Sequence, residues 1–269
     1  MDMYVEIYGD NIVRICRGRD PKQRTESVVL KVRPVEALDI DSASNQHLHL
    51  GRYTIRLQNG LLGITRMGRP YFEEISYQLR NKRLLWSHKI PEGVRIYGFG
   101  EKGGPLNKRG WRKLRLVNVD PGFRYRTPHT DPLYLNIPFY IMAKPGYAVG
   151  IYIDSSSYMW IDPGVSNPLV MHIEKVGEDL DYYIFLGNNV RETIKLFTLL
   201  TGRQHLPPLW SIGFHQSKWS YGDEETVIEI ATKMRRLGIP CDAIHLDLSL
   251  IHISEPTRPR LISYAVFRL

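Results

Sequence analysis

The sequence contains only two cysteines, Cys16 and Cys241, among its 269 residues. Two cysteines so far apart exclude a disulfide framework and a cysteine-based metal site. No stretch approaches the roughly 18 uninterrupted apolar residues that a membrane-spanning helix needs. The first residues carry acids where a secretory signal needs basic residues and an apolar run. A cytoplasmic protein with no membrane partner is therefore expected.

The formal net charge of +8 raises the question of a nucleic-acid partner. The basic residues are scattered, and their densest group lies within residues 108–115 rather than along one helix face. No nucleic-acid motif accompanies this group. A basic surface without a specific nucleic-acid partner is the preferred interpretation. Nucleic-acid binding ranks third, behind the two functional hypotheses given below.

Residues 1–187 have the pattern of short strands separated by turns. Tyr53, Ile55 and Leu57 alternate with polar residues, as in a half-buried strand. Asn59-Gly60 follows and suits a tight reversal, because glycine tolerates a positive φ. Further strands are predicted over residues 61–65, 134–143, 148–152 and 181–186. Many short strands over this length predict an antiparallel β-sandwich domain.

A helical pattern begins at residue 188. Four apolar residues between residues 190 and 200 recur at helical spacing, with Asn188 or Asn189 as the N-cap and Gly202 after the end. This pattern predicts a helical linker over residues 188–206.

Residues 207–247 are expected to begin a parallel α/β domain. A buried strand is predicted at residues 210–215, a helix at residues 224–237 after the N-cap Asp223, and a second strand at residues 243–247. Strand, helix and strand with short connections form a βαβ unit. About 40 residues cannot bury a core alone, which predicts that this domain is incomplete.

The last segment, residues 248–269, does not fit this domain. Residues 248–258 resemble the translation of a transposase-type sequencing-library adapter, and residues 262–269 resemble its continuation with a mismatch only at Arg268. The segment lacks periodicity and contains two prolines. We therefore expect residues 248–269 to be adapter-derived, and the authentic sequence to be truncated at Asp247.

Three segments offer candidate sugar-site residues, and none is specific by itself. Asp247 ends a predicted parallel strand, at the edge where α/β barrels place active sites, although an exposed loop acid fits equally well. Residues 213–222 combine aromatic and hydrogen-bonding groups, as sugar sites do, but core packing explains Trp219 equally well. Residues 120–131 form a polar loop, for which a plain surface role is the simpler interpretation.

Short motifs follow one another in a defined order along the chain. They are Tyr97-Gly98-Phe99-Gly100-Glu101, Thr130-Asp131-Pro132-Leu133-Tyr134, Ile137-Pro138-Phe139, Asp181-Tyr182-Tyr183 with Leu186-Gly187, Leu200-Thr201-Gly202-Arg203, Leu206-Pro207-Pro208-Leu209-Trp210, Gly213-Phe214-His215-Gln216-Ser217 with Tyr221-Gly222, and Ile239-Pro240-Cys241-Asp242 leading to Asp247. Each motif alone is modest. The ordered set resembles glycoside hydrolase family 31, the α-glucosidase and α-xylosidase family, over essentially all of residues 51–247.

This resemblance implies a galactose-mutarotase-like β-sandwich over residues 1–187, followed by the first βαβ unit of a truncated (β/α)8 barrel. It implies that Asp120 and Asp247 bind substrate, with Asp247 hydrogen-bonding the sugar in subsite −1. It places His215 and Trp219 near that site. The implied substrate is an oligosaccharide or another α-glycoside with terminal glucose or xylose, and no metal or other cofactor is implied.

The family's chemistry is retaining hydrolysis by a nucleophile and an acid/base carboxylate. The resemblance places both carboxylates on later barrel strands, so this chain is expected to lack them and to be inactive alone. The main alternative from another functional class is a non-catalytic carbohydrate-binding β-sandwich protein. That alternative explains the strands and the aromatic residues, but it does not explain the predicted βαβ unit.

Overall fold

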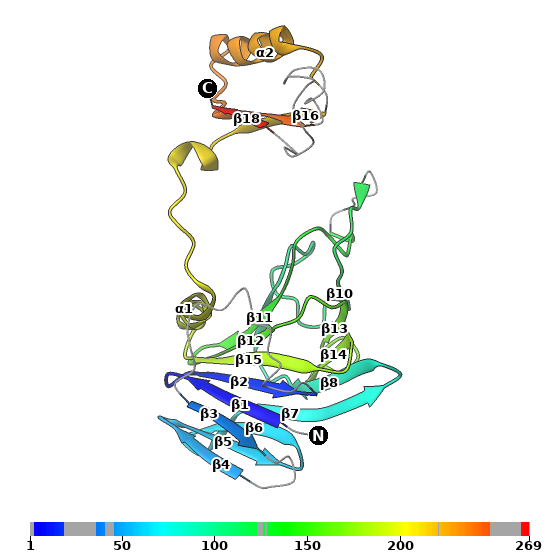
Figure 1. The fold of residues 1–269 in the computed structure, drawn as a ribbon, viewed down its shortest axis with the longest axis vertical. Coiled ribbons are helices and arrows are strands. Elements are labelled where there is room, and N and C mark those ends of the chain that lie inside the picture. The colour runs from blue at the N-terminus through cyan, green and yellow to red at the C-terminus, as the bar shows by residue number, and fades with distance from the viewer. Residues whose placement is uncertain are drawn as a thin grey trace. The chain divides into compact units, whose positions relative to one another are not determined.

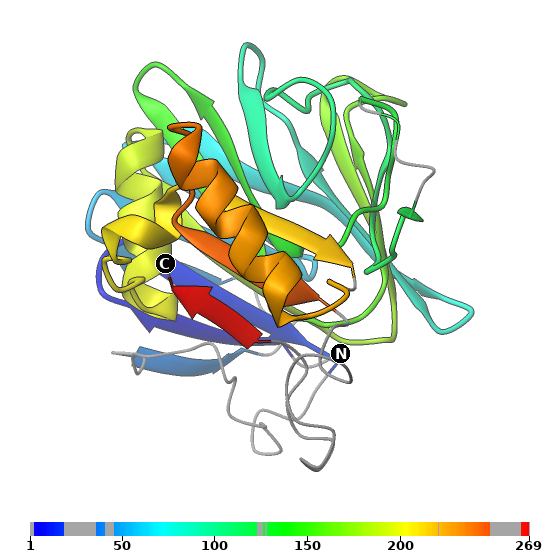
Figure 2. The same ribbon diagram turned by 90° about the horizontal axis from the view of Figure 1, so that it is seen from above.

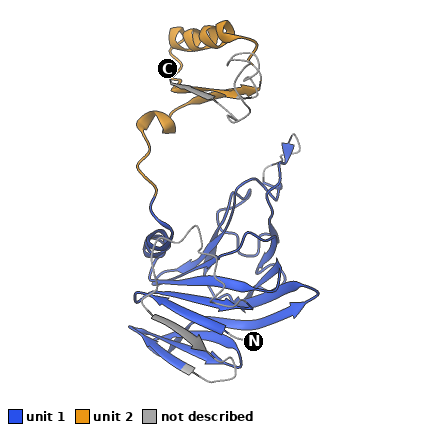
Figure 3. Cartoon of the chain, in the orientation of Figure 1, with its two compact units in different colours: residues 1–203 blue, residues 204–269 orange. Residues whose placement is uncertain are grey.

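A computed structural model describes residues 3–18, 36–40, 46–122, 126, 128–219, 221–247 and 265–268. The chain divides into two compact units, residues 1–203 and residues 204–269 (Figure 3). No helix among the described residues is long and apolar enough to cross a membrane. The finer domain boundaries expected from the sequence stay predictions.

The first unit is a sandwich of two antiparallel sheets (Figure 1). The seven-stranded sheet contains, in spatial order, β3 (Glu36–Ile40), β1 (Met3–Tyr8), β2 (Ile12–Arg17), β15 (Leu180–Gly187), β12 (Tyr147–Ile153), β11 (Asn136–Lys144) and β9 (Arg95–Gly100). The eight-stranded sheet contains β10 (Leu114–Leu116), β13 (Met159–Pro163), β14 (Val170–Val176), β8 (Arg83–Lys89), β7 (Arg69–Arg80), β6 (Leu61–Arg66), β5 (Tyr53–Gln58) and β4 (Gln46–Leu50). The predicted antiparallel β-sandwich is confirmed.

The β5–β6 hairpin forms as the alternation predicts. Tyr53, Ile55 and Leu57 are buried in the sandwich core, and Ile55 pairs with Ile64 across the hairpin. The turn residues Asn59 and Gly60 have φ values of 52° and 71°. Two successive positive φ values match the right-handed twist of the flanking strands, which is why Asn-Gly is favoured at this position.

The motif around Phe99 lets β9 pass close to β11. A Cβ on Gly98 would collide with the backbone of Phe139 and Tyr140, and one on Gly100 would collide with the segment from Leu135 to Ile137. Between them Phe99 also has a positive φ, and its fully buried ring stacks on Tyr140 at 5.0 Å. The two glycines therefore serve the packing of the strands.

A buried carboxylate, Glu74 of β7, links the two sheets. Arg17 of the seven-stranded sheet donates to both oxygens, at 3.0 and 2.6 Å, and the Tyr182 hydroxyl donates at 2.7 Å. Trp86 Nε1 and the Leu62 amide donate from the eight-stranded sheet, at 2.8 and 2.7 Å. Burial raises the pKa of Tyr182 well above its ordinary value, so its hydroxyl keeps the proton that it donates.

Helix α1 (Val190–Thr201) closes the first unit against the seven-stranded sheet. Asn189 is the N-cap, its side chain accepting from the Glu192 amide at 3.0 Å, and Gly202 is the C-cap, as the sequence pattern predicts. The ring of Phe197 stacks on Phe139 of β11 at 4.0 Å.

The second unit is a βαβ unit with an added strand. It contains the 3₁₀ helix η3 (Leu209–Ile212), β16 (His215–Trp219), α2 (Glu224–Arg236), β17 (Ala243–Asp247) and β18 (Ala265–Arg268). β16 and β17 are parallel, and β18 is antiparallel to β17. Helix α2 covers one face of this sheet (Figures 1 and 2), burying Ile244 and Leu246 with Ala231.

The strand predicted at residues 210–215 is wrong. Pro208 is the N-cap of a 3₁₀ helix, in which the Ser211 amide donates to the Pro208 carbonyl at 3.0 Å. The strand begins only at His215. The helix prediction is confirmed, because Asp223 accepts from the Thr226 amide at 2.7 Å and α2 ends one residue earlier than predicted. Residues 248–264 and 269 lie outside the described residues, so the adapter interpretation stays a prediction.

Replacing Glu74 with glutamine is expected to lower the free energy of unfolding by about 3–5 kcal/mol, because Arg17 is left charged and buried without its partner. Urea denaturation of the chain measures this loss. Glu73→Gln is the matched control, since Glu73 pairs with the exposed Lys89 and should contribute about 0–1 kcal/mol. Equal losses for the two variants would contradict the role assigned to Glu74.

Candidate functional site

The polar loop of residues 117–135 connects β10 of one sheet with β11 of the other. Residues 123–125 and 127, which include Arg124 and Tyr125, lie outside the described residues. In Figure 1 the loop, in green, extends beyond the end of the sandwich. Because this loop joins strands of two different sheets, contacts at both of its ends are needed to hold it in place.

Lys102 and Asp131 fix the base of this loop. The Lys102 ammonium lies 3.1 Å from Asp131 Oδ1 and donates to the Arg115 carbonyl at 2.6 Å and to Asn136 Oδ1 at 2.8 Å. Its side chain is only 1% exposed, and burial lowers the pKa of Lys102 although Asp131 opposes the shift. Asp131 Oδ2 accepts from the Arg115 amide at 2.9 Å. The pair therefore joins the segments before and after the loop.

Asp120 is exposed on this loop as an ionised hydrogen-bond acceptor. Hydrogen bonds from the Tyr134 hydroxyl and the Gly122 amide hold the pKa of Asp120 below its ordinary value. The amide of Gly122 donates to Oδ1 at 2.7 Å. A carboxylate of this kind can accept hydrogen bonds from sugar hydroxyls.

His215, at the start of β16, has both ring nitrogens engaged within the second unit. Nε2 lies 3.1 Å from the Trp210 carbonyl, and Nδ1 lies 2.9 Å from His245 Nε2. A carbonyl only accepts, so His215 carries its proton on Nε2 and accepts at Nδ1 from His245. In this geometry His215 positions neighbouring groups, and its contact with sugar stays a prediction.

Trp219 and Asp247 are the last residues of the parallel strands β16 and β17, and they are register partners. Trp219 is 65% exposed, so its ring is not packed in the core that the described residues of the second unit form, and its contact with sugar stays a prediction. The side chain of Asp247 lies outside the described residues. The structure thus brings His215, Trp219 and Asp247 onto one pair of strands, while Asp120 belongs to the first unit.

Sequence reasoning missed two residues of the second unit. His245 is the partner of His215, and finding it requires the register between β16 and β17. Asp242 closes the start of the strand pair, since its carboxylate accepts from the Phe214 amide at 3.2 Å while its own amide donates to the Phe214 carbonyl at 2.8 Å. Asp242 belongs to the motif Ile239-Pro240-Cys241-Asp242, but the sequence does not show that its side chain bonds to Phe214.

The described residues hold no group of three or more His, Cys, Asp or Glu side chains that could bind a metal ion. What they offer is a carboxylate on a fixed loop, and an exposed indole at the carboxyl end of a parallel strand. Carboxylates bind hydroxyl groups, and an indole presents an apolar face to the CH groups of a ligand.

Both units match known family descriptions. Residues 2–162 match the "Glycosyl hydrolase 31 N-terminal galactose mutarotase-like domain", and residues 204–264 match the "Glycosyl hydrolases family 31 TIM-barrel domain". The two matches occur in the order that the sequence motifs indicate.

Curated relatives and solved structures agree with these matches. Alpha-glucosidase 2 of Bacillus thermoamyloliquefaciens is 38% identical over 159 residues, covering 59% of this chain and 20% of that protein. Alpha-xylosidase XylQ of Lactiplantibacillus pentosus is 33% identical over 176 residues, covering 61% and 22%. A Flavobacterium johnsoniae family 31 dextranase, solved with isomaltotriose, superposes with a TM-score of 0.77 at 25% identity, covering 90% of this chain and 31% of that one. The chain thus spans about a fifth of the length of the curated relatives that it matches.

Replacing Tyr134 with phenylalanine is expected to raise the pKa of Asp120 toward its ordinary value, because the lost hydrogen bond stabilised the charged carboxylate. Carboxyl NMR titration of the chain measures the shift. Tyr158→Phe, at another exposed tyrosine, is the control and should leave the pKa of Asp120 unchanged. A Tyr134→Phe titration curve that overlays the wild-type curve would contradict this contact.

Proposed function

The chain belongs to glycoside hydrolase family 31, and from that premise we propose that its parent protein is a retaining α-glycosidase that removes terminal α-linked glucose or xylose from oligosaccharides. The parallel pairing of β16 with β17 carries the proposal, since it sets Trp219 and Asp247 in register at the carboxyl ends of the strands. Barrel enzymes of this fold place their active sites at that end.

We assign each candidate residue a binding role. Asp120 and Asp247 accept hydrogen bonds from sugar hydroxyls, and Trp219 offers an apolar face to the pyranose. His215 holds the start of β16 through Trp210 and His245, at the opposite end of the strand pair from Trp219 and Asp247, and so supports the strand that carries Trp219. These tasks orient the sugar and do not break the glycosidic bond.

Retaining hydrolysis needs a nucleophile and an acid/base carboxylate about 5–5.5 Å apart. We propose that both come from later barrel strands of the parent protein. In the first step the nucleophile forms a glycosyl-enzyme while the acid protonates the leaving oxygen. In the second step water, deprotonated by the same acid/base residue, releases the sugar with retained configuration. The chain by itself is then expected to show no hydrolysis.

A non-catalytic carbohydrate-binding sandwich is the competing function. The β-sandwich is compatible with it, but a sandwich that only binds has no need for the parallel β16–α2–β17 unit. Cytoplasmic location stays a prediction, for which the support is that neither Cys16 nor Cys241 forms a disulfide.

In a protein extended through the complete barrel, Asp120→Asn and Asp247→Asn are each expected to lower kcat/KM by about 10- to 100-fold, the range for losing a charge-assisted hydrogen bond. Hydrolysis of aryl α-glucosides and α-xylosides provides the measurement. Asp223→Asn is the control, because asparagine also caps helices and α2 should be preserved. Full activity in both site variants would refute their binding roles, and an inactive wild-type barrel would refute the proposed function.

A further inference from the structure

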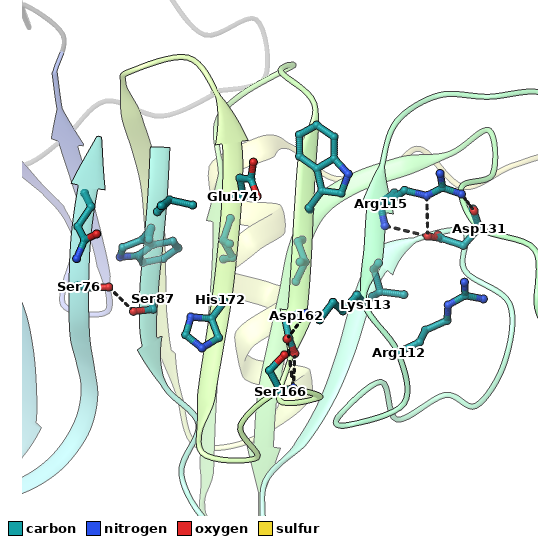
Figure 4. A pocket seen from close by; sticks show the side chains of 17 residues that line it. Ser76, Ser87, Arg112, Lys113, Arg115, Asp131, Asp162, Ser166, His172 and Glu174 are labelled. Carbon is teal, nitrogen blue, oxygen red and sulfur yellow. Dashed lines mark hydrogen bonds and ion pairs between the residues drawn. The ribbon is translucent and has the colours of Figure 1, made fainter. Parts of the chain in front are cut away.

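The outer face of the eight-stranded sheet bears a groove with a volume of about 620 Å³, within the range of about 300–1,000 Å³ typical of small-molecule sites (Figure 4). It crosses strands β7, β8, β14, β13 and β10, and the loop residues Arg112, Asp131 and Ser166 complete its wall. The groove lies entirely within the first unit. None of Asp120, His215, Trp219 and Asp247 lines it.

Strand alternation arranges the groove's polar side chains in rows across the sheet. Ser76 pairs with Ser87, Ser87 with His172, and His172 with Asp162, so these side chains form one row. Figure 4 shows Ser87, His172 and Asp162 side by side on neighbouring strands.

A second row lies two residues further along the strands. Leu85 pairs with Glu174, Glu174 with Trp160, and Trp160 with Arg115. In a strand, residues two apart point to the same face, so both rows open into the groove.

Charged side chains of both signs line the groove. They are three cations, Arg112, Lys113 and Arg115, and three carboxylates, Asp131, Asp162 and Glu174. Each carboxylate already has a cationic partner, because Asp131 pairs with Lys102, Asp162 lies 3.5 Å from Lys113, and Glu174 pairs with Arg83. Since Lys102 and Arg83 lie outside the lining, the guanidinium groups of Arg112 and Arg115 add N–H donors to the groove.

Part of the hydrogen-bonding capacity in the groove is not used by the protein. The side chain of His172 is exposed, and its ring forms no hydrogen bond with the residues that the structure describes. The hydroxyls of Ser76 and Ser87 bond to each other at 2.6 Å, which leaves acceptor lone pairs directed elsewhere. Trp160 is half-buried at the other row, where the Arg83 guanidinium lies 5.2 Å from its ring. Donors, acceptors and an aromatic ring in one groove are the chemistry that recognises a polyhydroxylated molecule.

We propose that this groove is a second carbohydrate-binding site, which holds an oligosaccharide away from the residues assigned to the glycosidase site. His172 hydrogen-bonds the sugar hydroxyls, and Trp160 contacts the pyranose ring. The groove's donors, acceptors and aromatic ring indicate a ligand rich in hydroxyl groups, and the choice of an α-glucan as the probe rests on the proposed function.

Maltotriose titrated into the 269-residue chain, followed by NMR and by calorimetry, tests the proposal. Binding with a millimolar dissociation constant is expected, as is usual for weak ligands held by few contacts. Trp160→Ala and His172→Ala should each weaken binding by about tenfold, or about 1.4 kcal/mol. The exposed ring of His172 makes no hydrogen bond with the described residues, so its variant should fold even if the Trp160 variant does not.

Matched controls locate the binding. Tyr158→Ala and His47→Ala remove an exposed aromatic side chain and an exposed histidine that do not line the groove, and they should leave the affinity unchanged. Absence of maltotriose binding, binding that His172→Ala does not weaken, or tighter binding of inorganic phosphate than of maltotriose would overturn the proposal.

The groove proposal and the hydrolase proposal can be refuted independently of each other. If a chain extended through the barrel hydrolyses α-glucosides while His172→Ala leaves maltotriose binding intact, only the groove proposal falls. If the groove binds maltotriose while the extended chain is inactive, only the hydrolase proposal falls.

Discussion

The charge of Glu74, buried between two sheets, constrains the registers of five strands of the sandwich. Its side chain is fully buried, so each of its hydrogen bonds must come from the protein. Arg17 and Tyr182 approach from the seven-stranded sheet, and Trp86 and the Leu62 amide approach from the eight-stranded sheet. These donors meet only if five strands keep their registers, since a shift by one residue would turn the donors to the opposite face. Sheets held in this register position the strands that line the outer groove and the two ends of the loop that bears Asp120.

Several residues of the family motifs have structural contacts that shape the backbone. Gly98 and Gly100 admit a close strand crossing, Asp131 anchors a loop through Lys102, and Asp242 closes the first parallel strand pair. The motifs therefore identify the fold much more strongly than they identify the sugar contacts. This distribution is physically reasonable, because a substrate contact works only when its backbone is held to within a fraction of an ångström.

The sequence revealed the elements whose signals are local. The Asn59-Gly60 hairpin and the caps Asn189 and Asp223 each depend on a few neighbouring residues, and all formed as predicted. The long β7–β8 pair was missed because the buried Glu74 breaks the apolar alternation and the register shifts between Glu74 and Ser76. Residues 210–215 suggested a strand, but after the two prolines residues 209–212 form a 3₁₀ helix. The His215–His245 contact and the rows of the groove arise from pairing between strands, which no local pattern contains.

The central claim is that this chain is the front part of a family 31 hydrolase whose catalytic carboxylates are encoded further on. Sequencing the source DNA beyond the codon for Asp247 tests it most directly. The account predicts an open reading frame that continues into further βα units and supplies two carboxylates at the ends of later barrel strands. A source gene that itself encodes residues 248–269 followed by a stop codon would contradict it, and carbohydrate binding would then be the better functional hypothesis.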